Sequence, residues 1–531
     1  MDSSTSMEDP SRIDAHGALL HPPSPTLYNT NDDDGSTGVI DFSTLALRHA
    51  GLSAQLKPNG QLDFSDPASV RELTRALLAR DFALRLSVVP EDRLCPPVPG
   101  RWAYVAWVGG LVDSTDPRVP KGDVMGRGER ERQVLGVDVG TGASAIYALL
   151  ALRARRGWRV VATEADKKSL RAARANVSDN GAGVVGRCRV VEAEEREEDG
   201  QDGQRDEGGE EGAGQGDSKR LRILPLKALR EMGVHRVDFV MVNPPFYASA
   251  EEMRASARAK KRPPNSCCTG SEGEMICEGG EVGFVGRMIA ESVAIRDAAT
   301  MARRGPRRGM GTKEGGTLQV QWWTSMLGKL SSIGVLIEQL RGQGCSNYAV
   351  TEFVQGSKTR RWGLAWSWEG WRPSVDVARA IPGLEKRLLP SVTEARFEVE
   401  GEADGVGKRV DEYVEELELD GDDDEGDGVR WVWKPRERMG LGACHRGDCW
   451  SRKARRAREQ EARRRRRAGE VDQVMGGGDE EDETEPQLVF RIRVAEGELG
   501  MARVEVRWLR GQDAVLFESF VGWLKRKLKE G

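Results

Sequence analysis

A four-residue run, Asn243-Pro244-Pro245-Phe246, groups the side chains best suited to chemistry in this sequence. The Asn243 amide oxygen and the Pro244 carbonyl can each accept a hydrogen bond from a planar exocyclic amine, which would orient its lone pair and support the charge gained during attack. Phe246 can stack on the ring that carries the amine. The two prolines hold the peptides between them in a fixed, extended shape. The run predicts a pocket for methyl transfer to an amine; the alternative is an ordinary Pro-Pro turn.

A glycine-rich turn at residues 138–144, Asp-Val-Gly-Thr-Gly-Ala-Ser, is the second candidate feature. Gly140 and Gly142 allow a tight turn and a close approach of the backbone to a ligand. Glu164 ends the next predicted strand, where an acid can hold both ribose hydroxyls of a nucleoside cofactor. Ordinary sheet–helix packing and a helix-capping acid are the alternatives for the two features taken singly. Together with Asn243 they predict a site for S-adenosylmethionine, which has a ribose and an amino acid but no phosphate.

Alternating strands and helices must position these residues. The apolar run 237–242 just before Asn243 is typical of a buried strand, and open α/β sheets bind ligands at the carboxyl ends of their strands. We predict strands at 133–139, 158–163, 187–192, 236–242, 318–326, 348–353 and 362–368. Helices are predicted at 69–78, 143–153, 280–299 and 335–341, and a further helix follows the strand at 158–163 and ends at residue 176. The last two strands form an antiparallel hairpin. The fold class is therefore α/β, a class I methyltransferase with a mostly parallel, Rossmann-like, seven-stranded sheet.

Composition divides the chain of 531 residues into several parts, because 31% of the residues are charged and only 38% are hydrophobic. A helical module is expected before the sheet and a small α+β unit after it. The predicted parts are a disordered tail at 1–40, an N-terminal module at 41–128, a methyltransferase core at 129–370 with disordered insertions at 194–218 and 303–316, a charged low-complexity linker at 371–487 with a basic run at 452–467, and a small C-terminal domain at 488–531.

Charge and cysteine usage indicate the compartment and the partner. Lys and Arg number 80 against 85 Asp and Glu, and the net charge of −5 conceals strong segregation along the chain. The basic run 452–467 suits RNA or nuclear import, and the alternative is a solvated linker. Eight cysteines without disulfide-like spacing, and no long apolar run, predict a reduced intracellular protein without a membrane span. With the basic run read as an import signal, the expected location is the nucleus, with the cytoplasm as a further location. Cys444, His445 and Cys449 lack a fourth ligand, so we expect no zinc site.

Five basic residues follow the candidate pocket: Arg254, Arg258, Lys260, Lys261 and Arg262. A mobile loop that carries them could clamp an RNA backbone beside the pocket, because phosphate contacts need positive charge. The alternative is a loop that is simply solvated.

Beyond these local features, the sequence resembles the family of U6 small nuclear RNA adenine-N6 methyltransferases (methyltransferase-like protein 16 and its fungal relatives), with a more distant bacterial ribosomal-RNA branch. The resemblance covers about residues 41–368. It is carried by Gly140-Thr141-Gly142-Ala143-Ser144, Ala162-Thr163-Glu164, Asn243-Pro244-Pro245-Phe246, Glu278-Gly279-Gly280-Glu281, Met326-Leu327-Gly328-Lys329, Thr351-Glu352-Phe353-Val354-Gln355-Gly356 and Arg361-Trp362-Gly363-Leu364-Ala365-Trp366-Ser367.

The resemblance implies roles for matching residues. Residues 243–246 would form the adenine pocket, and Gly140, Ser144 and Glu164 would contact the cofactor. Arg101 would reach the cofactor carboxylate, a task that suits a bidentate ion pair. The resemblance also implies that the module at 41–128 binds RNA and, with the basic loop, frames the RNA groove. The domain at 488–531 would be an accessory domain, since it faintly resembles an accessory RNA-binding domain of animal members.

We therefore predict an S-adenosylmethionine-dependent RNA adenine-N6 methyltransferase acting on U6 small nuclear RNA. The alternatives are methylation of another structured RNA such as ribosomal RNA, methylation of a protein glutamine, and a non-enzymatic RNA-binding scaffold. Glutamine methyltransferases usually carry Tyr where Phe246 stands and lack the basic loop. A scaffold would not need an intact Asn-Pro-Pro-Phe run.

Overall fold

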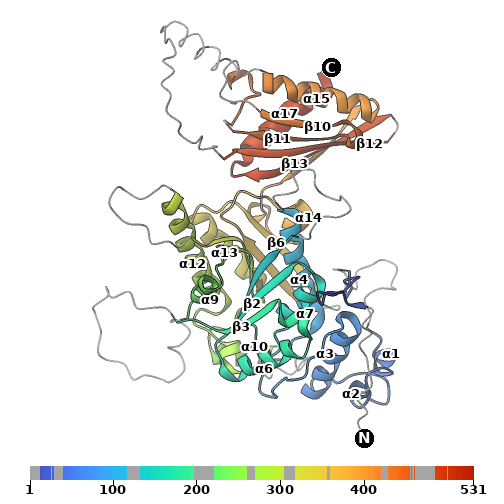
Figure 1. Cartoon of the computed structure of the whole chain (residues 1–531), viewed down its shortest axis with the longest axis vertical. Helices are drawn as coiled ribbons and strands as arrows, with labels where there is room; N and C mark the ends of the chain where they lie inside the picture. The colour runs from blue at the N-terminus through green and yellow to red at the C-terminus, as the bar shows by residue number, and fades with distance from the viewer. Residues whose placement is uncertain are drawn as a thin grey trace, which may run out of the picture. The chain divides into compact units, whose positions relative to one another are not determined.

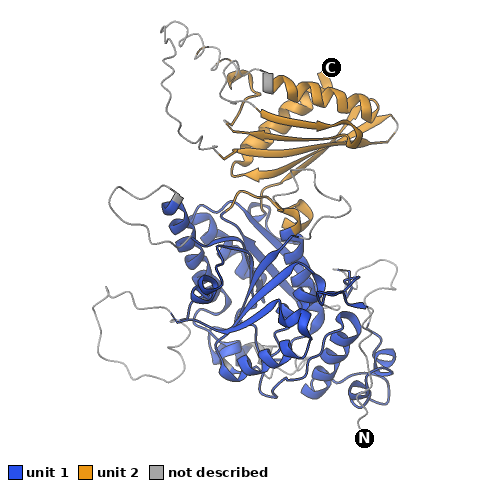
Figure 2. Cartoon of the chain, in the orientation of Figure 1, with its two compact units in different colours: residues 1–112, 128–368, 379–389 blue, residues 113–127, 369–378, 390–531 orange. Residues whose placement is uncertain are grey.

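The structure, a computed structural model, forms two compact units, coloured blue and orange in Figure 2. Unit 1 comprises residues 1–112, 128–368 and 379–389, and unit 2 comprises residues 113–127, 369–378 and 390–531. The described residues are 12–24, 27–28, 40–116, 132–195, 221–259, 270–303, 317–355, 359–419, 429–445, 447–454, 456, 460, 485–498 and 500–530.

Unit 1 is built on an eight-stranded sheet with the order β3-β2-β1-β4-β5-β7-β6-β8. Figure 1 labels β2, β3 and β6 of this sheet. The strands from β3 to β5 run parallel, and β7 is antiparallel to both β5 and β6. This confirms the predicted class I methyltransferase fold, with one short strand, β8, added beside β6. The strands are β1 (Val134–Val139), β2 (Trp158–Glu164), β3 (Cys188–Glu192), β4 (Arg236–Val242), β5 (Gln319–Leu327), β6 (Tyr348–Gln355), β7 (Thr359–Trp366) and β8 (Arg379–Ala380).

The strand order brings the two candidate motifs together. Strand β1 pairs with β4 in parallel, and Val139 lies opposite Val242 at the ends of the two strands. The glycine turn that begins at Gly140 and the run that begins at Asn243 therefore leave the same edge of the sheet from adjacent strands, as the sequence predicts.

Helices flank the sheet of unit 1. Helices α9, α12 and α13 pack on it through a cluster of buried residues that includes Val240, Met288 and Ile337. Helix α5 begins at Ile146, three residues later than predicted, because Ala145 has a left-handed backbone (φ 49°) and ends the turn. The helices are α1 (Phe42–Ala46), α2 (Ala50–Ser53), α3 (Pro67–Phe82), α4 (Val98–Ser114), α5 (Ile146–Ala154), α6 (Lys167–Ser178), α7 (Ala182–Val185), α9 (Leu226–Glu231), α10 (Ala250–Ala259), α11 (Glu272–Met275), α12 (Gly280–Arg303) and α13 (Leu330–Gly342).

The predicted disordered tail at 1–40 is wrong for residues 12–24, which pack on unit 1. The buried guanidinium of Arg153 donates to the Gly17 carbonyl at 2.7 Å, and the Trp102 indole donates to the Ser24 carbonyl at 2.8 Å. Ala18 is only 1% exposed. A buried charge needs hydrogen-bond acceptors, and this polar segment supplies them although its composition suggests a tail.

Unit 2 is an antiparallel five-stranded sheet with the order β10-β11-β12-β13-β9. Helices α15 and α17 contribute to the same hydrophobic core, which lies on one face of the sheet. Its elements are α14 (Val375–Ala378), β9 (Glu394–Glu400), α15 (Ala403–Leu419), β10 (Val429–Lys434), β11 (Met439–Cys444), β12 (Leu488–Glu496), β13 (Met501–Gly511) and α17 (Ala514–Glu530).

The prediction of a charged linker over 371–487 is therefore wrong, because this range supplies three of the five strands and one of the two core helices. In β9 the charged residues alternate with apolar ones, and Phe397 and Val399 point into the core. A strand with one solvated face can carry many charges and still fold. The accessory domain is also larger than 488–531, since that segment supplies only β12, β13 and α17.

Several predicted segments lie largely or wholly outside the described residues. They are the insertions at 194–218 and 303–316 and most of the basic run 452–467. Across the described part of the chain, no helix is both long and apolar enough to cross a membrane.

Candidate active site

The side-chain oxygen of Asn243 is an unused buried acceptor. Oδ1 is shielded from solvent and has no hydrogen-bond partner among the described residues. Leaving a buried acceptor unpaired costs roughly 1–3 kcal/mol, so the position suits a ligand that brings an N–H donor. This agrees with the sequence-based role of Asn243 as an acceptor for an exocyclic amine.

Tyr104, from helix α4, fixes the strand end that carries Asn243. Its hydroxyl lies 2.7 Å from Thr324 Oγ1 and 3.3 Å from the main-chain nitrogen and oxygen of Val242. Thr324 in turn donates to the Val240 carbonyl at 2.9 Å. The sequence analysis gave Tyr104 no role, because nothing local in a helix shows that it reaches a strand more than a hundred residues away.

Phe246 forms an aromatic wall beside Asn243. The ring is half-buried, and the guanidinium carbon of Arg361, from β7, lies 5.4 Å from its centroid. Burial and the nearby Arg101 charge lower the pKa of Arg361 below its usual range. A ring backed by a cation offers a face on which a planar base can stack.

The glycine turn forms an open cradle at the end of β1. Gly140 and Gly142 both have left-handed backbones (φ 66° and 67°), which other residues rarely adopt. A Cβ placed on Gly140 would meet no described atom within 4 Å. Beneath the turn, Thr141 donates to Asp138 at 2.7 Å, and burial raises the pKa of Asp138 to about 7. The chain thus leaves room for a ligand at this turn.

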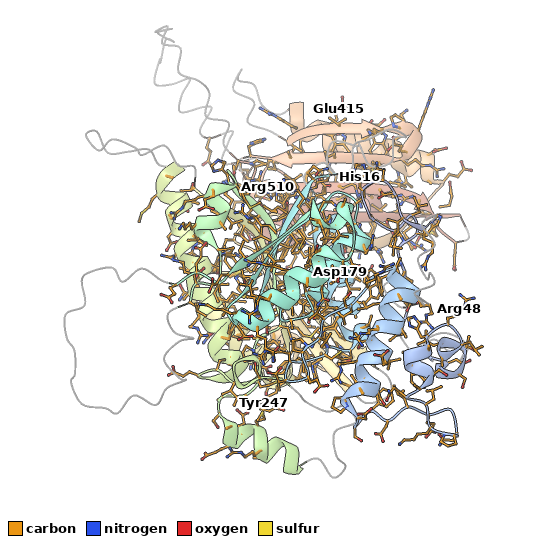
Figure 3. All side chains as sticks on the ribbon, turned by 60° about the horizontal axis from the view of Figure 1, so that its bottom comes forward. His16, Arg48, Asp179, Tyr247, Glu415 and Arg510 are labelled. Atoms are coloured by element: carbon orange, nitrogen blue, oxygen red, sulfur yellow. The ribbon has the colours of Figure 1, made fainter. Side chains whose placement is uncertain are left out.

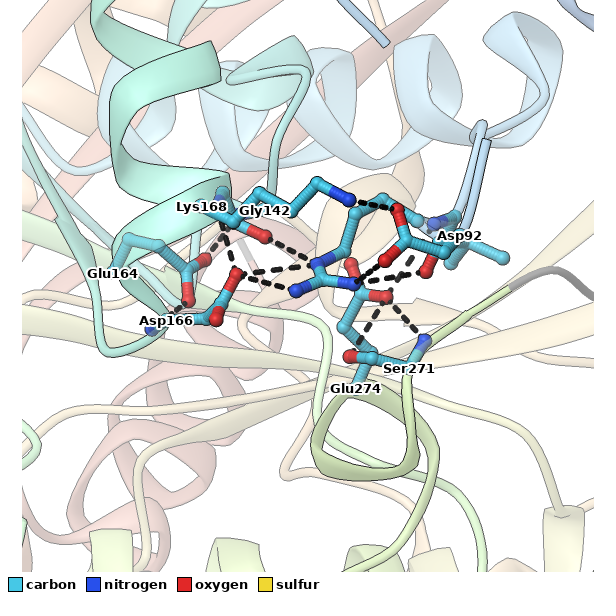
Figure 4. Close-up of polar contacts among 10 residues, drawn as sticks. Asp92, Gly142, Glu164, Asp166, Lys168, Ser271 and Glu274 are labelled. Carbon is cyan, nitrogen blue, oxygen red and sulfur yellow. Dashed lines mark hydrogen bonds and ion pairs between the residues drawn. The ribbon is translucent and has the colours of Figure 1, made fainter. Parts of the chain in front are cut away.

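Glu164 lies across the same turn (Figure 4). Its carboxylate accepts the Gly142 N–H at 2.8 Å and the Asp166 N–H at 2.9 Å, and burial raises its pKa. The two amides orient one carboxylate at the end of β2, where ribose hydroxyls would be held. Ser144 is buried in the turn itself, ahead of α5 rather than inside the helix.

Two further segments close over the turn, and the sequence analysis did not single them out. Ser271 and Glu274 form a capping box at α11, in which Glu274 accepts the Ser271 N–H at 2.7 Å. Glu274 Oε1 would lie 4.0 Å from a Cβ placed on Gly142. On the neighbouring segment Arg93 pairs with Asp166 at 2.9 Å. In the sequence, the Ser-x-x-Glu pattern at residues 271–274 indicates the capping contact between Ser271 and Glu274.

Arg101 lies in α4 and is 8% exposed. Its Nη1 donates to the Tyr147 hydroxyl at 2.7 Å, and its guanidinium carbon lies 5.4 Å from the Tyr147 ring centroid. Its Nε is buried and unpaired within the described residues. A buried guanidinium with an unused donor fits an incoming carboxylate, and its contact with a cofactor stays a prediction.

The donors and acceptors around the turn fit S-adenosylmethionine. The cradle at Gly140 leaves space for it, Glu164 offers a carboxylate to ribose hydroxyls, and Arg101 offers a buried cation to a carboxylate. The unpaired Asn243 oxygen completes the set on the adjacent strand. The structure thus brings all the predicted pocket and cofactor residues into unit 1. Asn243, Phe246, Gly140 and Glu164 lie at the predicted strand ends, whereas Ser144 precedes its helix and Arg101 lies in a helix that was not predicted.

The prediction of a basic loop is wrong for its first two residues. Arg254 and Arg258 lie in helix α10, not in a loop, because Ser249 and Glu252 cap the helix start: the Glu252 N–H donates to Ser249 Oγ at 3.1 Å, and Glu252 accepts the Ala248 N–H at 2.7 Å. Tyr247 lies just before this helix, as Figure 3 shows. Arg254 is exposed, and the remaining residues of the set, Lys260, Lys261 and Arg262, lie outside the described residues.

Comparisons with known proteins place this site in context. Residues 27–199, 218–301 and 312–370 match the family described as RNA methyltransferase. The chain is 28% identical over 472 residues to the U6 small nuclear RNA (adenine-(43)-N(6))-methyltransferase of Schizosaccharomyces pombe, covering 89% of this chain and 96% of that protein. It is 32% identical to human RNA N(6)-adenosine-methyltransferase METTL16 over 66% of this chain, and it spans only 51% of that longer relative.

A bacterial relative and a solved structure extend the comparison. The large subunit ribosomal RNA methyltransferase F of Pseudomonas putida is 29% identical over 65% of this chain and 93% of its own length. The crystal structure of the human METTL16 catalytic domain in complex with MAT2A 3'UTR hairpin 1 aligns with a TM-score of 0.45 at 31% identity, covering 62% of this chain and 91% of that one.

Proposed function

The chain belongs to the RNA methyltransferase family, and from this membership we propose that it methylates the N6 amine of an adenine in U6 small nuclear RNA with S-adenosylmethionine as the methyl donor. The likeness to the Schizosaccharomyces pombe enzyme over nearly the whole length of both chains supports U6 small nuclear RNA as the substrate. The observation that carries the proposal is the buried, unpaired Asn243 oxygen beside the Phe246 ring, at the strand next to an open glycine cradle.

The residues of the pocket act by holding the base. A target adenine leaves its stack to reach them, and single-stranded or bulged RNA lowers the cost of that step. Phe246 stacks on the flipped ring, while Asn243 Oδ1 and the Pro244 carbonyl accept the two hydrogens of the amine. This directs the nitrogen lone pair toward the cradle at Gly140. S-adenosylmethionine supplies a methyl group made electrophilic by its sulfonium.

The chain needs no general base at the start of the reaction. The amine becomes acidic only as it is alkylated, so its proton can leave late. Orientation by the Asn243 and Pro244 oxygens, which also favour the positive charge that develops on nitrogen, is then the main contribution of the protein. Pro245 keeps these groups rigid because its ring fixes the backbone between Pro244 and Phe246.

A three-substrate assay tests the proposal. The purified chain is mixed with radiolabelled S-adenosylmethionine and, separately, a U6 small nuclear RNA transcript, a large-subunit ribosomal RNA fragment and a glutamine-containing peptide. We expect label in the U6 transcript, released as N6-methyladenosine on nuclease digestion. Label in the ribosomal fragment alone or in the peptide alone would reassign the substrate, and RNA binding without label in any arm would support the scaffold alternative.

The cellular site is part of the proposal. The basic run 452–467 suits recognition by an import receptor, which would deliver the protein to the nucleus. A fluorescent fusion should accumulate in nuclei, and replacing Arg463–Arg467 by alanine should disperse it. Equal distribution of both fusions would contradict the assignment.

A further inference from the structure

Glu281 is a buried carboxylate to which the chemistry above assigns nothing. It lies in the first turn of α12 and is 2% exposed. Its oxygens accept hydrogen bonds from the Gly328 N–H at 2.6 Å, the Lys329 N–H at 3.1 Å and the Ser332 hydroxyl at 2.5 Å. All three donors belong to the end of β5 and the start of α13, so one carboxylate fixes the connection between them.

That connection lies directly against the aromatic wall. A Cβ placed on Gly328 would lie 2.9 Å from Phe246 Cδ1, 3.3 Å from Cε1 and 3.2 Å from Glu281 Oε2. The Gly328 backbone therefore packs on the Phe246 ring at one point and on the Glu281 carboxylate at the next. Even a methyl group would not fit between this backbone and the ring, so a shift of the backbone toward the ring is expected to move the ring.

The residue before Glu281 contacts the backbone of the same wall. Gly280 has φ 59°, and a Cβ on it would lie 3.3 Å from the Phe246 carbonyl oxygen and 3.2 Å from the Ala248 nitrogen. Tyr247 is held in addition, since its N–H donates to the Met275 carbonyl at 3.1 Å. The start of α12 thus constrains Phe246 in two ways. Gly280 packs against the backbone of Phe246, and Glu281 acts on the Phe246 ring through Gly328.

We propose that Glu281 is a positioning residue for methyl transfer, which sets the orientation of the Phe246 ring through Gly328 and so fixes where the target adenine stacks. It does not touch the substrate. The inference rests on the proposed function, because it assigns Phe246 the stacking role given there. The charge of Glu281 also raises the pKa of the half-buried Arg361 guanidinium behind the ring, against the lowering caused by burial and by Arg101.

The test begins with Glu281→Gln, which keeps the size of the side chain. A glutamine amide presents an NH2 group where the carboxylate accepted a main-chain N–H or the Ser332 hydroxyl, so the connection loses part of its anchor. We expect kcat on U6 RNA to fall about 10–100-fold, with affinities for cofactor and RNA within about two-fold of wild type. A kcat within about two-fold of wild type would overturn the inference.

A double-mutant comparison separates positioning from a general structural effect. If Glu281 acts through the ring, Phe246→Ala and the combined Phe246→Ala, Glu281→Gln variant should have the same kcat. Multiplied losses in the combined variant would overturn the inference. Glu252→Gln is the matched control: it removes the 2.5 Å ion pair with the exposed Lys329 ammonium on the same connection, while its amide oxygen can still accept the Ala248 N–H. It should leave kcat unchanged.

Hydrogen–deuterium exchange on the cofactor-free protein gives a readout that does not depend on activity. In Glu281→Gln, peptides that cover 326–332 and 244–248 should both exchange faster than in wild type and in Glu252→Gln. Unchanged exchange at 244–248 would show that the connection does not support Phe246, which overturns the inference. If exchange rises as expected but the wild-type chain methylates none of the tested RNAs, the proposed function fails and the link between Glu281 and Phe246 stands.

Discussion

At the scale of single residues, the role proposed for Asn243 depends on one side-chain atom. Its Oδ1 is buried and unpaired among the described residues, so the free energy that the folded chain gives up there is recovered only when a donor arrives. Removing the oxygen should therefore affect the reacting amine and leave the glycine cradle intact.

We expect Asn243→Ala to lower kcat on U6 RNA by about 10²–10³-fold, the loss seen when one preorganised polar contact to a reacting group is deleted. Cofactor affinity, measured by calorimetry, should stay within about two-fold of wild type. Asn243→Asp keeps an acceptor oxygen and should retain more activity than the alanine variant. Normal turnover by Asn243→Ala would contradict the mechanism.

The raised pKa of Asp138 predicts that the stability of the folded protein depends on pH. Burial, opposed by Thr141, raises its pKa from 3.8 to about 7, with Glu164 raising it further and Arg101 lowering it. From about pH 4 to about pH 7 the folded state keeps this proton while the unfolded chain releases it, so the free energy of unfolding falls as the pH rises and levels off above 7. Lower pH therefore favours the folded, cofactor-free protein at this site.

Asp138→Asn should remove that slope. Between about pH 4 and pH 8 the variant should gain stability relative to wild type, by up to about 4 kcal/mol. Urea titrations of the cofactor-free protein at several pH values measure the difference, with Asp179→Asn at an exposed position as the control. Parallel curves for Asp138→Asn and wild type would show that Asp138 is ionised in the folded state throughout this range.

The residues that act through local chemistry could be predicted, and the residues that act across the fold could not. Asn243, Phe246 and Glu164 were found because each follows a recognisable strand and has a side chain suited to a ligand. Tyr104 and Glu281 act on parts of the chain 138 and 47 residues away, to which no pattern of neighbouring residues points.

At the scale of elements, two asparagines hold the N-terminal module to the core: Asn176 lies in α6, and Asn180 follows the end of that helix. Asn176 accepts the Val88 N–H at 2.9 Å and donates to the carbonyls of Val88 at 2.8 Å and Ala143 at 2.9 Å. Asn180 makes the equivalent pair of bonds with Arg85, each at 2.9 Å. Because Ala143 belongs to the glycine turn, the same helix supports both the module and the cofactor cradle.

Asn176→Ala should loosen both attachments. It leaves the buried Ala143 carbonyl and the part-buried main-chain groups of Val88 without this partner, so we expect the free energy of unfolding to fall by roughly 2–4 kcal/mol. Cofactor affinity should fall several-fold as well, since the turn loses a support. Ser178→Ala, at an exposed position of the same helix, is the control for both denaturant titration and calorimetry. A loss of stability with unchanged cofactor affinity would show that Asn176 supports the N-terminal module but not the glycine turn.

The core strands could be predicted to within a residue or two at most ends because buried parallel strands are apolar throughout and short turns bound them. Strand β9 and helix α15 were assigned to a linker because their solvated faces give them a high average charge. The apolar alternation in β9, Ala395-Arg396-Phe397-Glu398-Val399, was the signal that composition concealed. Average composition cannot distinguish a one-sided element from a linker, whereas the period of the pattern can.

At the scale of the whole molecule, unit 2 carries a cluster of charged residues separate from the residues of the candidate active site. A cavity of about 320 Å³ on its sheet is lined by four arginines, Arg396, Arg491, Arg493 and Arg507, together with acids and smaller residues. Glu505 pairs with Arg396 at 3.4 Å, and Glu394 with Arg507 at 3.9 Å. Burial and the charge of Arg493 lower the pKa of Arg491, which lies directly opposite Arg507 in the sheet.

Like charges directly opposite each other destabilise a sheet, and Glu394 and Glu505 offset this repulsion only in part, since the pKa of Arg491 is still lowered. A further anion beside Arg491 would therefore be favourable. RNA phosphate is the anion that the proposed function supplies, so Arg491→Gln should weaken binding of a U6 transcript. The slope of log affinity against log salt should fall by about 0.7 for each phosphate that the variant no longer binds, with cofactor affinity unchanged. Arg436→Gln, exposed on the same unit but outside the cavity, should preserve the slope. If Arg491→Gln and wild type have the same slope, the cavity does not bind RNA, and the arginines serve only the ion pairs of unit 2.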